Sequence, residues 1–148
     1  MKYSDFARFL PGSVVRQLRL GLLALALLCT APHPLPAEPM RLRSEASHFA
    51  LRVTGIERPE RVNHIHSVEL SLTRADGEPV PGAAIVLTGQ RRYSSNSLPT
   101  LPQVSSGLGA GHYQVRGVRF HMPGEWRLVF DIVVEQIRDR ATLDVVVK

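Results

Sequence analysis

Histidine is the residue type in this chain with the clearest capacity for site chemistry. His64 and His66 stand two positions apart, a spacing that turns both imidazoles to one face of a β-strand, where they could supply two ligands to copper or zinc. His121 and Met122 are adjacent, and a thioether ligand favours cuprous copper. Both pairs also have an interpretation without a metal. Imidazoles at the start of a strand are often simply solvated, and Met122 suits a turn that packs on the end of a sandwich.

The serines are not accompanied by the residues that would make one of them a nucleophile. Ser94, Ser95 and Ser97 lie in a polar stretch, but no Gly-x-Ser-x-Gly elbow surrounds them. The sequence also contains no phosphate-cradling glycine loop and no dinucleotide fingerprint. We therefore expect a protein that is not an enzyme.

A basic pair beside an aromatic residue, Arg91-Arg92-Tyr93, offers a different kind of site. It could stack on or grip an acidic partner, although such a group is more often a solvated loop tip. The surrounding segment, Gln90–Gly109, is long for a simple connection and too polar for a core. We expect this loop, which also contains Asn96, to be the partner-binding surface if the domain has one.

The first 37 residues have the features of a cleavable secretory signal peptide. Arg16 and Arg19 precede an apolar run, Leu20–Cys29, that is about half the roughly 20 residues a membrane-spanning helix needs. Cleavage after Ala37 would leave residues 38–148 as a mature periplasmic or secreted bacterial domain with no stable membrane span. An uncleaved helix and a lipid-modified Cys29 are the alternatives.

The signal peptide also accounts for most of the excess positive charge. The formal net charge is +5 at pH 7, and residues 1–37 carry +3 of it, leaving +2 spread along the mature domain. A nucleic-acid partner is therefore not predicted. The only cysteine, Cys29, lies in the same leader, so the mature domain has neither a disulfide nor a thiol nucleophile.

Period-two alternation recurs throughout the mature domain and predicts an all-β, immunoglobulin-like sandwich of about seven strands. Glu38–Ala46 is expected to be a polar lead-in. Tyr113, after small residues at the start of a late strand, resembles a tyrosine corner, and Trp126 falls on an apolar face. The expected strands are His48–Thr54, Ile65–Thr73, Ala83–Leu87, Gln103–Ser105, Gly111–Val118, Trp126–Val134 and Ala141–Val147.

Several blocks of sequence resemble the YtkA-like family of small exported bacterial domains, which are similar in type to the FixH-like proteins. They are Asn63–Ser67, Asp76–Ala83, Leu98–Thr100 and Gly111–Trp126, whose FHMPGEW ending is the most specific. The resemblance implies an immunoglobulin-like periplasmic domain with an accessory role near copper handling or oxidase assembly. Relatives carry a His-x-His run just before Leu-Pro-Thr, whereas Ser94 and Asn96 stand there in this chain.

Two functions follow as hypotheses. The first is an exported, non-enzymatic interaction or accessory domain of the cell envelope that contacts an envelope protein through Gln90–Gly109. The alternative is a weak periplasmic copper-binding or copper-delivery domain that uses His64 and His66 with His121 and Met122, and copper is then its cofactor.

Overall fold

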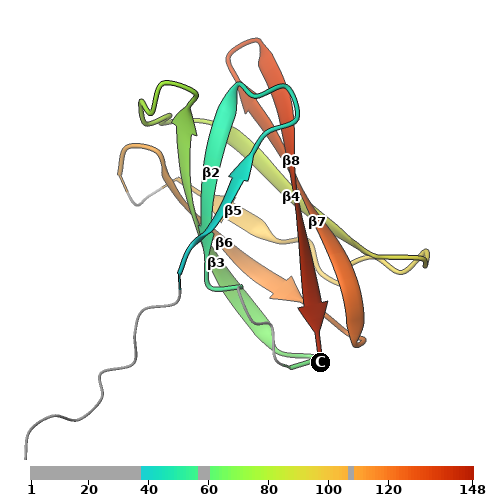
Figure 1. Ribbon diagram of the computed structural model, residues 1–148. Coiled ribbons are helices and arrows are strands. Elements are labelled where there is room, and N and C mark those ends of the chain that lie inside the picture. The colour runs from blue at the N-terminus through green and yellow to red at the C-terminus, as the bar shows by residue number, and fades with distance from the viewer. Residues whose placement is uncertain (1–37, 57–60, 107–108) are drawn as a thin grey trace, which may run out of the picture. The chain divides into compact units, whose positions relative to one another are not determined.

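The computed structural model describes residues 38–56, 61–106 and 109–148, and all regular structure in these ranges is β-strand (Figure 1). The predicted signal peptide, its cleavage site and Cys29 lie outside the described residues. The strands are β1 Met40–Arg43, β2 Phe49–Thr54, β3 Ile65–Arg74, β4 Ala84–Arg91, β5 Gln103–Ser105, β6 His112–Arg119, β7 Gly124–Val134 and β8 Ile137–Val147.

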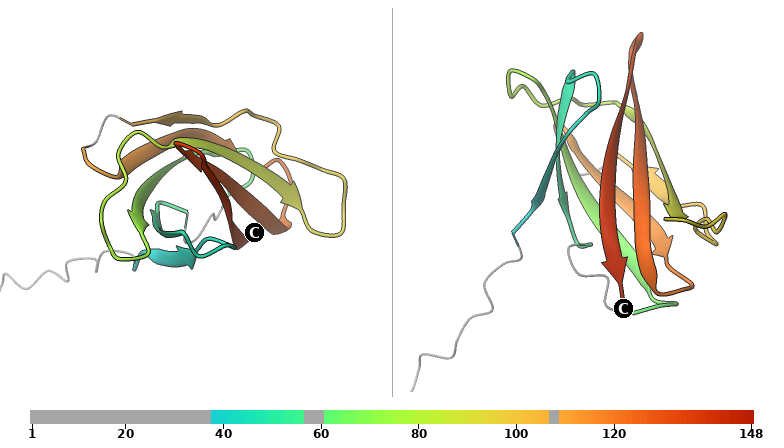
Figure 2. Two further views of the ribbon diagram at one scale, coloured as in Figure 1. Left: turned by 90° about the horizontal axis from the view of Figure 1, so that it is seen from above. Right: turned by 45° about the vertical axis from the view of Figure 1, so that its right-hand side comes forward.

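The strands form two antiparallel sheets that enclose one core, as in a β-sandwich (Figure 2). The five-stranded sheet has the order β1-β2-β3-β6-β5, and the three-stranded sheet has the order β4-β7-β8. The chain crosses from one sheet to the other between β3 and β4, returns between β4 and β5, and crosses again between β6 and β7. The all-β prediction is confirmed. Among the residues that the structure describes, no helix is long and apolar enough to cross a membrane.

The core is built from the inward-facing residues of both sheets, because side chains alternate between the two faces of a strand. In β7 every second residue from Trp126 to Val134 is buried, and in β8 the same holds from Ala141 to Val147. Trp126 is 0% exposed and packs edge-on against Phe120, with ring centroids 5.4 Å apart. The predicted alternation, with Trp126 on the apolar face, is therefore confirmed.

Three errors in the predicted strands are larger than two residues. The expected polar lead-in contains β1, where Met40 and Leu42 alternate with arginines and pack against the core. β4 extends to Arg91, so the long segment after it begins two residues later than predicted. β8 begins at Ile137, earlier than the predicted Ala141. The prediction stopped short because Asp139, a charged residue, occupies an inward position of the strand. The short strand Gln103–Ser105 is confirmed.

Tyr113 fastens the crossing between the two sheets. Its hydroxyl donates to the Val80 carbonyl at 2.6 Å and accepts the Ala83 N–H at 2.9 Å. The predicted structural role is confirmed, but the backbone that Tyr113 holds lies some 30 residues earlier in the chain rather than at an adjacent corner. The Pro79–Gly82 segment is thereby fixed at the start of β4.

Candidate functional site

The segment after β4 folds back along its own strand in a tight turn. The Arg91 N–H donates to the Asn96 carbonyl at 2.8 Å, and the Leu98 N–H donates to the Gly89 carbonyl at 3.0 Å. We call residues 92–97 the tip loop. It projects from the body of the domain beyond the end of β4 (Figure 1).

Gly89 allows the base of the tip loop to close. A Cβ atom at position 89 would lie 2.9 Å from Cγ of Leu98 and 2.7 Å from Cδ2 of Leu128, closer than carbon atoms approach. Without that atom, Leu98 packs over the strand and against the core. Inside the loop, the Gln90 side chain donates to the Ser94 carbonyl and the Ser94 hydroxyl accepts the Asn96 N–H, both at 3.0 Å. The tip loop is therefore held by its own hydrogen bonds.

Tyr93 stands at the turn of the tip loop, where it is 92% exposed. Its φ of 58° is in the left-handed region, which non-glycine residues adopt at a cost of about 1–2 kcal/mol. The guanidinium group of Arg92 lies over its ring, with Cζ 5.3 Å from the ring centroid. The fold thus orders a large aromatic side chain almost entirely in solvent.

The arginines beside Tyr93 are positioned by backbone and carboxylate groups. Arg91 Nε donates to the Pro123 carbonyl at 3.1 Å, and Arg92 lies 3.5 Å from Asp144 and 3.7 Å from Glu125. Arg127 makes a two-point contact with Asp144, at 2.8 and 2.9 Å. These hydrogen bonds from Arg127 keep the pKa of Asp144 below its usual value, and the charge of Arg92 adds to the effect.

A shallow hollow beside the tip loop brings the arginines and the aromatic ring together. The charged groups around the hollow are the three arginines Arg91, Arg92 and Arg127 and the two carboxylates of Glu125 and Asp144, so its surroundings carry a net positive charge. The predicted residues Arg91, Arg92 and Tyr93 all contribute to it, whereas Arg127, 36 positions later than Arg91, was not predicted. Its position opposite Gln90 in the β4–β7 ladder is what brings it there. The lining residues are Gln90, Arg91, Arg92, Tyr93, Ser94 and Arg127.

The two histidines at the start of β3 lie against each other. The ring centroids of His64 and His66 are 5.2 Å apart, and His66 also contacts Phe120 at 6.0 Å. His66 is paired with the fully buried Val118, so its side chain is on the inner face of the sheet. Its Nε2 atom is buried without a hydrogen-bond partner. Burial and the neighbouring His64 lower the pKa of His66.

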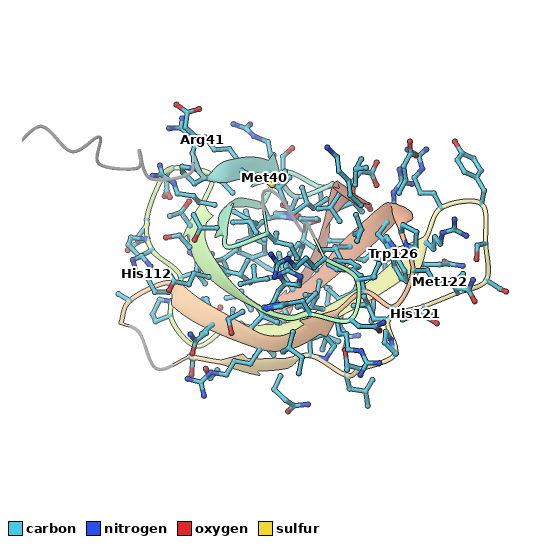
Figure 3. The ribbon with its side chains drawn as sticks, turned by 90° about the horizontal axis from the view of Figure 1, so that it is seen from below. Met40, Arg41, His112, His121, Met122 and Trp126 are labelled. Carbon is cyan, nitrogen blue, oxygen red and sulfur yellow. The ribbon has the colours of Figure 1, made fainter. Side chains whose placement is uncertain are left out.

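His121 and Met122 lie beside Trp126, at some distance from His112 (Figure 3). The His121 ring contacts Trp126 at 5.5 Å, and the Met122 sulfur accepts a 3.5 Å hydrogen bond from Asn96. Phe120 and Trp126 form the ring contacts that lead from His66 to His121. Among the described residues, no three histidine, cysteine or acidic side chains are grouped to hold a metal ion. The structure thus places His64 with His66 and, separately, His121 with Met122.

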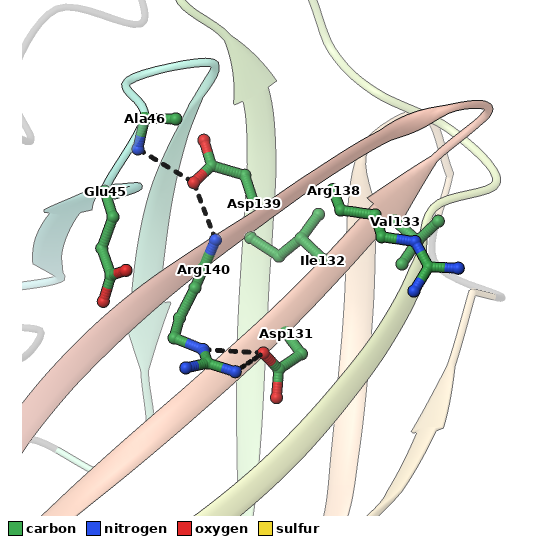
Figure 4. Close-up of a pocket in the computed structure, with 8 residues that line it drawn as sticks. All are labelled: Glu45, Ala46, Asp131, Ile132, Val133, Arg138, Asp139 and Arg140. Carbon is green, nitrogen blue, oxygen red and sulfur yellow. Dashed lines mark hydrogen bonds and ion pairs between the residues drawn. The ribbon is translucent and has the colours of Figure 1, made fainter.

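A second polar cluster, which the sequence analysis missed, joins the turn after β1 to β8 (Figure 4). Asp139 accepts hydrogen bonds from the backbone N–H groups of Ala46, His48 and Arg140, at 3.0, 3.2 and 2.8 Å. The His48 ring adds a contact of 3.2 Å. We call this arrangement the Asp139 clasp. A charged residue at an inward position of β8 was the signal that could have revealed it.

The Asp139 clasp has a structural role, although a serine, Ser44, lies near its histidine and its aspartate. The Ser44 hydroxyl is buried and exchanges hydrogen bonds with the backbone of Phe49 on both sides, so it is not placed as a nucleophile. Burial would raise the pKa of Asp139, but hydrogen bonds from the backbone N–H groups of Ala46, Arg140 and His48 hold it well below its usual range. In the adjoining hollow, Arg140 is occupied by Asp131 at 2.7 Å.

The chain matches no protein-family model and no curated protein sequence. The fold therefore defines the class, an all-β domain of two antiparallel sheets, and the tip loop with its hollow defines the candidate site.

Proposed function

We propose that this protein is an exported, non-enzymatic interaction domain with an immunoglobulin-like fold, and that the tip loop binds a protein partner in the bacterial cell envelope. The observation that carries the proposal is the 92% exposure of Tyr93 on a turn that is ordered by its own hydrogen bonds. An aromatic ring in that position gains little from folding. It gains much more when a partner covers it.

The composition of the tip agrees with this function. Tyrosine and arginine are among the residues that dominate binding energy at protein interfaces, where a large flat side chain offers contact area at a small cost in conformational entropy. The hydrogen bonds that Gln90 and Asn96 make to Ser94 hold the loop before a partner arrives, which lowers the cost of ordering it on binding. The positive hollow beside Tyr93 suits a partner that presents a carboxylate.

Export is supported by the leader-like residues 1–37, and the accessory role by the resemblance to YtkA-like domains. The alternative, copper delivery through His64, His66, His121 and Met122, has less support because the four side chains lie in two separate places. Export predicts a mature protein with a defined N-terminus. The protein recovered from the envelope fraction should begin at Glu38, and N-terminal sequencing of that material tests the cleavage after Ala37.

The binding function is tested by affinity recovery of partners from envelope extracts with the tagged full chain. Replacing a dominant interface tyrosine costs about 2 kcal/mol, which is roughly 30-fold in affinity, so Tyr93→Ser should abolish recovery of the main partner. Val86→Ser is the matched control, because Val86 is also exposed but lies on the outer face of β4. Equal recovery by the wild type and Tyr93→Ser, or no specific partner at all, would contradict the proposal.

A further inference from the structure

His64 and His66, the histidine pair, are not used by the proposed function, although their geometry has the features of a chelating site. Their rings lie 5.2 Å apart at an interplanar angle of 51°. An imidazole nitrogen binds zinc or copper at about 2.0 Å, which puts each ring centroid about 3.2 Å from the ion. Two such rings at a tetrahedral angle would have centroids about 5.2 Å apart. The observed spacing therefore fits one ion held between the two rings.

The state of the His66 ring supports the same conclusion. Its Nε2 atom is buried with no hydrogen-bond partner, and an unpaired polar atom in that position is unfavourable. An imidazole nitrogen that has no hydrogen-bond partner keeps its capacity to bind a metal ion in the tautomer that leaves its lone pair free.

The charged residue next to the pair in the ladder, Arg119, points away from it. Ile65 and its ladder partner Arg119 face the opposite side of the sheet from His66 and Val118, since successive residues of a strand point to opposite faces. His64 is exposed, so its ring can turn toward an ion and the remaining coordination positions can be filled by water.

We propose that the histidine pair binds one divalent late first-row transition-metal ion, with His64 and His66 as its two protein ligands. Imidazole donors and the usual order of stability make Cu²⁺ the tightest, followed by Ni²⁺ and Zn²⁺. The site is independent of the tip loop, so the failure of one proposal leaves the other standing.

The test is titration of the full chain with Cu²⁺ and Ni²⁺ by calorimetry, in a Cys29→Ser background that removes the only thiol. We expect one Cu²⁺ site with a Kd in the micromolar range or tighter, and at least a tenfold loss of affinity in His64→Ala. His64 is exposed, so that variant keeps its fold. His112→Ala is the matched control, because His112 is also exposed and lies on the same sheet. The affinity of this variant for Cu²⁺ should be unchanged.

Electron paramagnetic resonance of the Cu²⁺ complex gives a second readout. The spectrum should show coupling to two imidazole nitrogens in the Cys29→Ser protein and to one fewer in His64→Ala. His66→Ala should show the same loss, with circular dichroism to confirm that the sheet persists. Affinity that is equal in His64→Ala and its parent, or binding weaker than about 100 μM (roughly −5.5 kcal/mol), would overturn the proposal.

Discussion

The Asp139 clasp leads to a stability prediction whose size can be worked out from its contacts. The Asp139 side chain is 1% exposed and accepts two backbone hydrogen bonds at Oδ1 and one at Oδ2, where the His48 ring also lies. Asp139→Asn can keep the bonds at Oδ1, but its amide N–H₂ would face the His48 donors. Asp139→Ala loses all of them.

A hydrogen bond to a charged acceptor contributes about 1.5–3 kcal/mol, and water can replace part of this at the exposed residues Ala46 and His48. We therefore expect losses in the free energy of unfolding of about 2 kcal/mol for Asp139→Asn and about 3–4 kcal/mol for Asp139→Ala. The matched control is Asp131→Asn, which breaks only the exposed pair with Arg140 and should cost less than about 1 kcal/mol.

The pKa of Asp139 adds a pH signature. Because this pKa is lowered in the folded state, the stabilisation is complete above the unfolded-state pKa near 3.9 and is lost as the pH falls toward the folded-state value. Below about pH 4 the wild type should lose roughly 1.4 kcal/mol per pH unit through this group. Asp139→Asn lacks this contribution, so the difference between its free energy of unfolding and that of the wild type should become smaller as the pH falls.

Urea denaturation of the full chain at pH 7 and pH 3, followed by tryptophan fluorescence, measures all of these differences. The reasoning would be refuted by an Asp139→Asn deficit of equal size at both pH values. An Asp139→Ala loss no larger than that of Asp131→Asn would also refute it.

Three further predictions concern the core and the turns, and urea denaturation followed by circular dichroism checks each of them. Trp126→Ala should cost about 3–5 kcal/mol, whereas Arg127→Ala, which removes an exposed ion pair, should cost less than about 1 kcal/mol; similar losses would reverse the inward face of β7. Tyr113→Phe should cost about 2–3 kcal/mol because two buried backbone groups lose their partner. Gly111→Ala should cost more than Gly77→Ala, since both have positive φ but only at position 111 does a Cβ atom meet backbone, 2.7 Å from the Leu72 carbonyl; equal costs would exclude that contact.

Much of the fold was predictable because alternation is strong wherever one face of a strand is buried. The inward residues of β2, β3, β6 and β7 follow directly from it. β1 was missed because a four-residue strand with two arginines has the composition of a polar lead-in. The start of β8 was missed because Asp139 interrupts the apolar pattern, and only the backbone of the turn after β1, distant in sequence, makes that carboxylate tolerable there.

The candidate site was predictable only where its residues are contiguous. The exposed tip at Arg92 and Tyr93 follows from a polar segment between strands. The contributions of Arg127 and Asp144 depend on the ladders that join β4, β7 and β8, and residue spacing carries no signal of that register. In the same way, the i, i+2 spacing places His64 beside His66, but it could not reveal that aromatic rings stand between His66 and His121.

The position of the chain's only tryptophan has a practical consequence. Trp126 is fully buried, with Phe120 and His121 against its ring and its Nε1 donating to the Met122 carbonyl at 3.1 Å. Phe120 also contacts His66, so a paramagnetic ion bound at the histidine pair would lie within the range at which it quenches indole emission. The protein therefore contains an intrinsic optical reporter that needs no label. Blue-shifted emission reports the folded core, and loss of intensity without a red shift would report an ion bound nearby.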